Sequence, residues 1–276
     1  MNKLLLLLMM VGGGFMAGAA PLWMRYNTIS PDGSKIAFAY KGDIYVVDSR
    51  GGAAQRLTAW DSFESAPVWS NDGKTLAFVS DRNGGRDIFT IPATGGTATQ
   101  VTTHSAQENA LAFSKDDKYI YYTAVIQDPA HSVMFPDSWI SELYRIPVTG
   151  GRPEQILAAP VSNLCFDADG ESFLYENRTG SENIWRKHHV SSVARDIFHY
   201  DVQTGKHTQV TTNVGEDRSP FYTPDGKVVF LSERNGGSFN IYRADLQATD
   251  KAEALTSFRN HPIRFLTQAM DGTLCF

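Results

Sequence analysis

The sequence repeats itself, and this repetition constrains the fold more than any other feature. Each unit has an aspartate-containing turn, usually Asp-Gly, followed in the complete units by two short apolar runs, and four units end in Leu-Thr or Val-Thr. Three units also carry a Gly-Gly pair after the second apolar run. Repeats of this size build folds in which each unit packs only on its neighbours. The turn aspartates are Asp32, Asp72, Asp116, Asp169, Asp225 and Asp271.

Each repeat predicts four short strands. One apolar run follows the turn (36–38), a second precedes the Gly-Gly pair (44–47), a third ends at Leu-Thr, and a fourth leads into the next turn (66–69). Four strands at this spacing are typical of a propeller blade. The sequence therefore predicts an all-β, six-bladed propeller with four antiparallel strands per blade. The expected blades are 21–58, 59–102, 103–157, 158–211, 212–256 and an incomplete sixth at 257–276.

The sixth repeat stops within a predicted strand, which would leave an unpaired edge. We therefore expect the chain to be the front part of a longer protein.

Residues 1–20 are predicted to be a signal peptide. Lys3 supplies the positive charge, residues 4–11 form a short apolar core, and Ala17-Gly18-Ala19 fits a cleavage site. An uncleaved anchor is the alternative. The expected location is periplasmic or extracellular, with membrane contact only through this segment.

Composition narrows the function further. A net charge of −5 without a basic block argues against a dedicated nucleic-acid binder. A hydrophobic content of 42% argues against disorder. The two cysteines, Cys165 and Cys275, are too few for a disulfide scaffold or a structural zinc site. We expect two buried free thiols, with a disulfide between them as the alternative.

The repeats are similar to those of TolB-type propellers, and the details resemble the tricorn protease family. The opening stretch 23–58 resembles the first blade of that family's N-terminal six-bladed propeller. The insertion in blade 4, with Ile184-Trp185-Arg186-Lys187 and 194–198, resembles the family's lengthened fourth blade. Phe198 stands where the family has a second tryptophan, and the usual glycines are absent.

The resemblance implies a serine-type peptidase whose catalytic serine, histidine and glutamate residues lie in later domains. It implies that this chain is a non-catalytic propeller that filters or guides oligopeptides. The expected partners are the downstream domains of the same polypeptide, peptides, and further copies of the chain. The sequence contains no G-x-S-x-G motif for a nucleophilic serine, and His131-Ser132 reads as an ordinary loop pair.

Two alternatives stay open. One is a stand-alone periplasmic propeller of the TolB type that docks a partner protein or an envelope glycan. The other is the propeller of a prolyl-oligopeptidase-like enzyme.

Two insertions supply candidate contact residues. The blade 4 insertion carries Arg186, Lys187, His188 and Arg195, which could bind peptide carboxylates, an acidic domain or membrane phosphates. A solvated loop is the alternative. The blade 3 insertion (125–140) carries Phe135 and Trp139, which predict either a docking surface or a loop folded over its own blade.

Polar residues recur at the start of each inner strand and are predicted to line a central funnel. The alternative is ordinary turn polarity. These residues are Glu64, Ser65, Glu108, Asn109, Ser162, Asn163, Asp217 and Arg218.

No cofactor or metal is expected. His188 and His189 are neighbours and would point to opposite sides of a strand. The segment Asp81–Asp87 spaces its oxygens like the start of a calcium loop and recurs at 233–237, but no bidentate glutamate follows. Its Asn-Gly pair is typical of a hairpin turn, so a calcium site is the alternative to a turn here.

Overall fold

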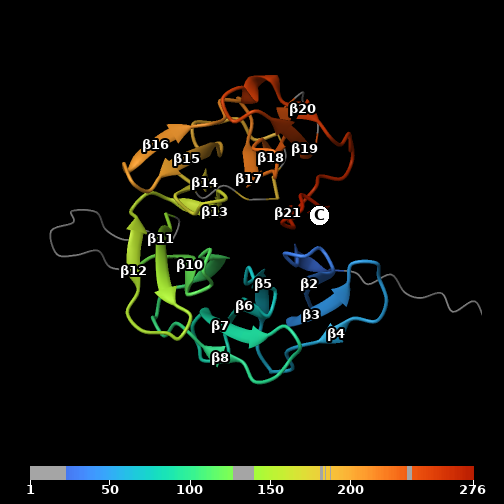
Figure 1. The fold of residues 1–276 in the computed structure, drawn as a ribbon, viewed down its shortest axis with the longest axis vertical. Coiled ribbons are helices and arrows are strands. Elements are labelled where there is room, and N and C mark those ends of the chain that lie inside the picture. The colour runs from blue at the N-terminus through green and yellow to red at the C-terminus, as the bar shows by residue number, and fades with distance from the viewer. Residues whose placement is uncertain (1–22, 127–139, 181–182, 184, 187, 235–237) are drawn as a thin grey trace, which may run out of the picture.

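A computed structural model describes residues 23–126, 140–180, 183, 185–186, 188–234 and 238–276. It contains five four-stranded antiparallel sheets and one two-stranded sheet, set around a common centre (Figure 1). The first strand of each sheet lies innermost. The inner strands are β1 (Arg25–Ile29), β5 (Glu64–Trp69), β9 (Asn109–Phe113), β13 (Val161–Phe166), β17 (Asp217–Tyr222) and β21 (Thr267–Gln268).

Each later strand pairs with the strand before it, so every blade is a meander from the centre outward. The second strands are β2 (Lys35–Tyr40), β6 (Thr75–Ser80), β10 (Tyr119–Ala124), β14 (Ser172–Asn177), β18 (Val228–Ser232) and β22 (Leu274–Cys275). The third strands are β3 (Asp43–Asp48), β7 (Asp87–Pro92), β11 (Glu142–Pro147), β15 (Ile197–Asp201) and β19 (Asn240–Ala244). The outer strands are β4 (Gln55–Arg56), β8 (Thr99–Gln100), β12 (Glu154–Leu157), β16 (Lys206–Gln209) and β20 (Glu253–Ala254). One 3-10 turn, η2 (Thr249–Lys251), precedes β20.

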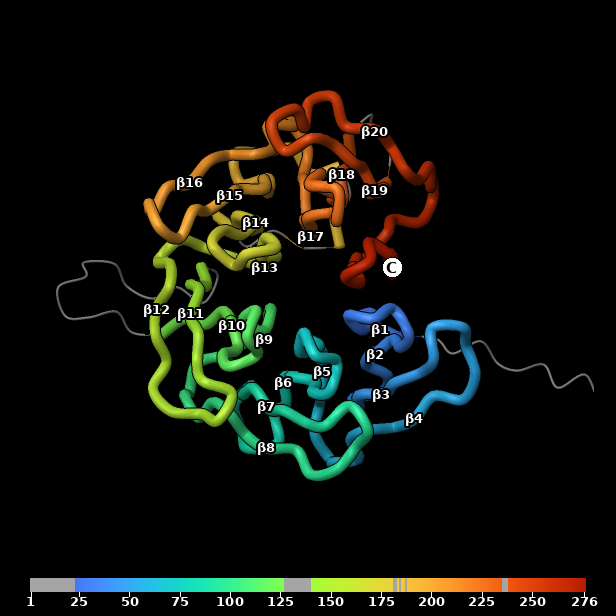
Figure 2. The backbone as a smooth tube through the Cα atoms, viewed as in Figure 1, coloured from blue at the N-terminus to red at the C-terminus, as the bar shows by residue number. Residues whose placement is uncertain are grey.

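The prediction of four antiparallel strands per blade is confirmed, but the prediction of six blades is only partly right. The described residues form five complete blades, and at the sixth position only β21 and β22 pair. This pair packs beside blade 1, where the Met270 amide donates to the Pro31 carbonyl at 2.9 Å. The colours in Figure 2 show the two ends of the described chain meeting there.

The aspartate turns form because the turn aspartate accepts hydrogen bonds from its own loop, except in the fourth unit, where Asp167 accepts them in place of Asp169. Ser30 Oγ donates to Asp32 Oδ1 at 2.6 Å, and Gly33 follows with a φ of 72° that favours glycine. The same hydroxyl–carboxylate contact recurs in blades 2, 3 and 5. The sequence motif is therefore the hairpin between the inner and second strands.

The threonine that ends most repeats accepts a hydrogen bond from the third strand and so links the outer part of the blade to that strand. In blade 1 the Ile44 amide donates to Thr58 Oγ1 at 2.9 Å. The same contact recurs in blades 2, 4 and 5. This contact pairs a buried amide that the short outer strand does not reach.

The hydrophobic core lies between neighbouring blades. Trp69 of β5 packs among residues of blade 1 such as Ile44, and its indole N–H donates to the Thr28 carbonyl at 3.1 Å. Large side chains such as Phe78 and Phe230 are fully buried in similar layers. Radial stacking of this kind protects the sheet edges.

Every complete inner strand contains a register shift, which frees part of its backbone from pairing. Ala66 and Ser219 have φ values of 50° at two of these shifts. Bulges bend a strand and redirect its side chains. The inner strands therefore present irregular backbone and polar side chains to the centre.

Three further sequence predictions concern chain chemistry and export. Cys165 and Cys275 are free and half-buried. Within the described ranges, no helix has the length and hydropathy needed to cross a membrane. The predicted signal peptide (1–20) lies outside the described residues.

Candidate functional site

A cavity of about 1890 Å³ occupies the centre of the ring. Residues of all six inner strands line it. It extends from the end where the inner strands begin, at Ser162 and Arg218, to the end of the aspartate turns, at Asp169 and Thr223. A cavity of this volume, with polar side chains set among apolar ones in its walls, can accommodate an extended peptide segment.

A buried carboxylate organises the end where the inner strands begin. Glu176, near the end of β14, is fully buried. Ser162 Oγ donates to Glu176 Oε1 at 2.8 Å, and the Ser219 amide donates to Oε2 at 3.2 Å. Asn163 also donates to Oε2, and Arg195 forms an ion pair with Oε1. Glu176 therefore joins blades 4 and 5 at the cavity wall.

Burial alone would raise the pKa of Glu176. The guanidinium groups of Arg195 and Arg218 outweigh burial and lower the pKa to about 2. Glu176 is therefore ionised at neutral pH and holds its arginine neighbours in place.

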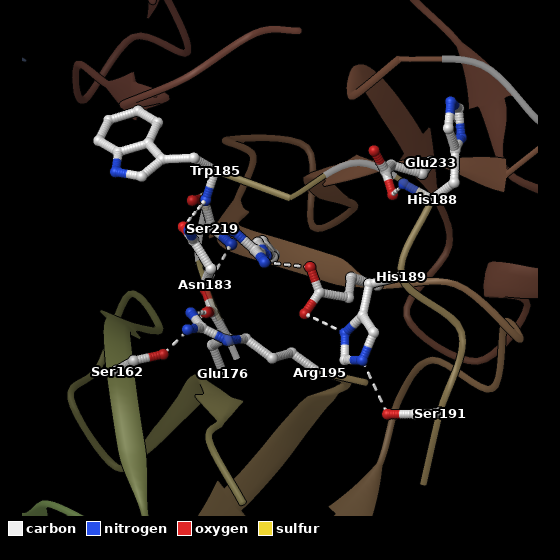
Figure 3. A network of polar contacts seen from close by, with 12 residues as sticks. Ser162, Glu176, Asn183, Trp185, His188, His189, Ser191, Arg195, Ser219 and Glu233 are labelled. Carbon is white, nitrogen blue, oxygen red and sulfur yellow. Dashed lines mark hydrogen bonds and ion pairs between the residues drawn. The ribbon is translucent and has the colours of Figure 1, made fainter. Parts of the chain in front are cut away.

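A second polar network lies beside the contacts of Glu176 (Figure 3). Glu216 forms an ion pair with Arg218 and lies 3.2 Å from His189 Nδ1. Ser191 Oγ lies 2.8 Å from His189 Nε2. Serine, histidine and glutamate thus have the connectivity of a catalytic triad. However, the His189 side chain is only 2% exposed, and Glu216 also forms an ion pair with Arg218. We therefore interpret these hydrogen bonds as structural contacts that hold the blade 4 insertion in place.

The blade 4 insertion reaches across to the opposite rim. The Trp185 ring is 43% exposed and lines the cavity. Arg25 of β1 lies 5.0 Å from its centroid and Arg264 lies 5.2 Å from it. Trp185 therefore narrows the opening of the cavity.

Four arginines line one side of the cavity at this opening, and we call them the arginine mouth: Arg178, Arg195, Arg218 and Arg264. In blade 4, Arg178 follows β14 and Arg195 precedes β15. Arg218 lies in β17, and Arg264 precedes β21. Side chains from three neighbouring sheets thus place positive charge on one side of the cavity.

The structure separates the predicted contact residues. Arg195 and Arg218 meet in the buried network around Glu176, whereas Arg186 is exposed. His188 is also exposed, and its amide donates to Glu233 Oε2 at 2.7 Å. Lys187, Phe135 and Trp139 lie outside the described residues.

The predicted funnel residues divide into two groups. The first lines the cavity and comprises Glu108, Asn109, Ser162, Asn163 and Arg218. The second is buried away from the cavity wall, because Glu64 pairs with Arg82 and Asp217 pairs with Arg234, while Ser65 is also buried. The prediction of a polar funnel is therefore only partly right.

The sequence reasoning missed Glu176, Arg178 and Arg264. Glu176 pairs with Ile197 at the position where blades 2 and 5 place Val79 and Leu231. A charged residue at this otherwise apolar position was the available signal.

The Asp81–Asp87 segment forms a turn in the structure. Gly84 N–H donates to the Asp81 carbonyl at 2.9 Å, and Asp81 Oδ1 accepts from the Phe63 amide at 2.7 Å. Across the described part of the chain, no three His, Cys, Asp or Glu side chains are placed to hold a metal ion. The related segment at 235–237 lies outside the described residues.

Glu108 lines the cavity at blade 3 and is expected to make stability depend on pH. Burial, together with the charge of Asp87, raises its pKa to about 7 against the lowering effect of the hydrogen bond from Thr102. The folded state therefore binds a proton more tightly than the unfolded chain between the ordinary value of 4.5 and about 7. Stability should fall as pH rises through this interval.

We expect Glu108→Gln to remove most of this pH dependence. Above pH 7 the variant should be more stable than the parent by on the order of 2 kcal/mol, and near the ordinary pKa the two should converge. Urea unfolding at several pH values measures this. The exposed control Glu171→Gln should show no such trend, and equal behaviour of both variants would contradict the assignment.

Comparison with known proteins places this architecture. The profile of the tricorn protease N-terminal β-propeller domain family matches residues 21–276. Dipeptidyl-peptidase 5 of Porphyromonas endodontalis is 24% identical over 267 residues, covering 78% of this chain and 38% of that protein. An uncharacterized protein of Agrobacterium fabrum is 27% identical over 104 residues, covering 37% of this chain and 31% of that protein. The chain thus spans about a third of the length of these relatives.

Solved structures show the same fold. A crystal structure of the tricorn protease superposes with a TM-score of 0.73 at 17% identity, covering 92% of this chain and 24% of that one. TolB from Acinetobacter baumannii superposes with a TM-score of 0.59 at 21% identity, covering 81% of this chain and 52% of that one.

Proposed function

Because this chain belongs to the tricorn protease N-terminal β-propeller family, we propose that it is a non-catalytic propeller that guides oligopeptides for an exported serine peptidase. The catalytic groups would lie elsewhere in the whole protein. Export rests on the predicted signal peptide at 1–20. The peptidase assignment is supported by the family match and by the dipeptidyl-peptidase relative.

The observation that carries the proposal is the central cavity of about 1890 Å³. Bulged inner strands offer it backbone groups that the sheets do not use, and these can pair with an extended peptide. Trp185 narrows the opening, so a linear chain should pass more easily than a folded one. Narrowing of this kind suits a filter.

Oligopeptide binding without cleavage tests the proposal. The purified protein should bind fluorescent linear oligopeptides and leave them intact, as judged by anisotropy and mass spectrometry. Hydrolysis by the purified protein that is abolished by Ser191→Ala would overturn the non-catalytic role, because Ser191 is the hydroxyl nearest to the buried histidine.

Removing the side chain at the opening should relax selectivity. We expect Trp185→Gly to strengthen binding of a disulfide-cyclised peptide by severalfold, because the wider opening admits it. Binding of the linear form should change little. Trp60→Gly is the matched control, since Trp60 is 63% exposed and does not line the cavity. An unchanged preference for linear peptides in Trp185→Gly would contradict the filter.

A stand-alone TolB-like propeller that docks a partner is the second candidate. Exposed aromatic side chains favour it, because Trp60 and Phe63 project from the loop before β5 with more than half of their surface exposed. Such patches mark interaction sites. Loss of partner or peptide binding in Trp60→Gly, with Trp185→Gly unaffected, would favour this role.

A further inference from the structure

The charge that faces the cavity at the arginine mouth is unbalanced. Glu176 is the carboxylate that lines the cavity among these four arginines. Two more carboxylates stand behind them, because Glu216 pairs with Arg218 and the charge of Glu233 acts on Arg264. Among the described residues, three carboxylates thus offset four guanidinium groups, which leaves one positive charge uncompensated there.

Arg178 carries the uncompensated charge. Within the described residues, no carboxylate forms an ion pair with it, and its buried Nε has no hydrogen-bond partner. Its backbone is fixed, since the amide donates to the Pro160 carbonyl at 3.3 Å. A buried guanidinium donor without an acceptor is costly unless a ligand supplies one.

The carboxylate whose charge acts on Arg178, Glu176, is already bound by other donors. Both oxygens of Glu176 already accept hydrogen bonds, Oε1 from Ser162 and Arg195 and Oε2 from Asn163 and the Ser219 amide. Burial and the charge of Arg195 both lower the pKa of Arg178, against the opposing effect of Glu176. The site therefore favours an additional negative charge.

We propose that Arg178, with Arg195 and Arg218 beside it, forms a subsite for a carboxylate group of a peptide in the cavity. The inference rests on the proposed peptide-guiding function and names the group that is recognised. A guanidinium matches the two oxygens of a carboxylate in a planar fork. One uncompensated positive charge suits a carboxylate better than a phosphate, which carries close to two negative charges.

Three acetylated alanine-rich peptides test the inference: one with a free C-terminal carboxylate, one amidated, and one amidated with a single internal aspartate. Calorimetric titration of the parent should show about tenfold tighter binding of at least one acidic peptide than of the neutral one. Arg178→Gln should abolish this advantage and Arg178→Lys should retain part of it. Arg152→Gln, at an exposed position, is the control for charge and should behave as the parent.

Stability separates a lost site from a damaged fold. Because Arg178→Gln removes an uncompensated charge, its midpoint of thermal unfolding should equal or exceed that of the parent. Loss of the carboxylate advantage in a variant of this stability supports the subsite.

The outcomes distinguish the source of the carboxylate. An advantage confined to the free C-terminus, or to the internal aspartate, supports the subsite and identifies which group it takes. An advantage that survives in Arg178→Gln, or no advantage although the amidated peptide binds, overturns the subsite and leaves the peptide channel intact.

A peptide-free measurement separates the two proposals. If no peptide binds, but acetate raises the unfolding midpoint over chloride at equal ionic strength in the parent and not in Arg178→Gln, the subsite stands and the peptide channel fails. If acetate has no effect either, both are overturned.

Discussion

Replacing Glu176 by alanine is expected to lower the free energy of unfolding by about 3–5 kcal/mol. The substitution leaves Arg195 buried without its ion-pair partner and leaves the amide of Ser219 without an acceptor. It also removes the charge of Glu176, which opposes the lowering of the Arg178 pKa by burial and by Arg195. Urea unfolding of the purified protein measures the loss.

The control for this prediction is Glu171→Ala, which truncates an exposed glutamate in the same blade. We expect its effect to stay within about 0.5 kcal/mol. Similar losses in both variants would show that Glu176 does not hold the arginine mouth together.

Replacing Phe239 by alanine should cost about 3–5 kcal/mol, as expected for a large aromatic side chain removed from a packed core. Phe239 is 0% exposed and packs with Leu231 and Ile263. Arg218 lies 5.0 Å and Arg264 lies 5.5 Å from its ring centroid. The substitution should therefore also weaken carboxylate binding, because two arginines lose the surface on which they rest.

Phe258→Ala provides the comparison, since Phe258 is 47% exposed. Its unfolding free energy should change by less than about 1 kcal/mol. If carboxylate binding is unchanged in a folded Phe239→Ala protein, then Phe239 does not position the arginines of the arginine mouth.

The blades could be predicted from sequence because their determinants are local. The turn at Asp32 is closed by Ser30 and Gly33, and the threonine contact of Thr58 reaches back to Ile44 in the same blade. Short-range hydrogen bonds of this kind leave a repeating signature in the sequence.

The arginine mouth could be predicted only in part, because its contacts join distant segments. Glu176 binds Ser162, Arg195 and Ser219, which belong to three separate stretches of the chain. The sequence suggested Arg195 as part of an accessible basic cluster, whereas the structure buries it in an ion pair. Nothing in the local sequence indicates that Arg178 should lack an ion pair with any carboxylate of the described residues.

The blade count follows the same local signature. The turn at Asp271 predicts a sixth unit, and the sequence also predicts that this unit is incomplete. The described residues provide two paired strands at the sixth position, β21 and β22, and these pack on blade 1.

Location of a bound peptide tests the central claim most directly. A linear oligopeptide with a photoreactive residue can be cross-linked to the purified protein and the attachment sites mapped by mass spectrometry. The account predicts cross-links at residues that line the cavity, such as Asn163, Ser219 and Phe265. Cross-links confined to the exposed loop at Trp60 and Phe63 would contradict it, because the peptide would then bind the surface and not the channel.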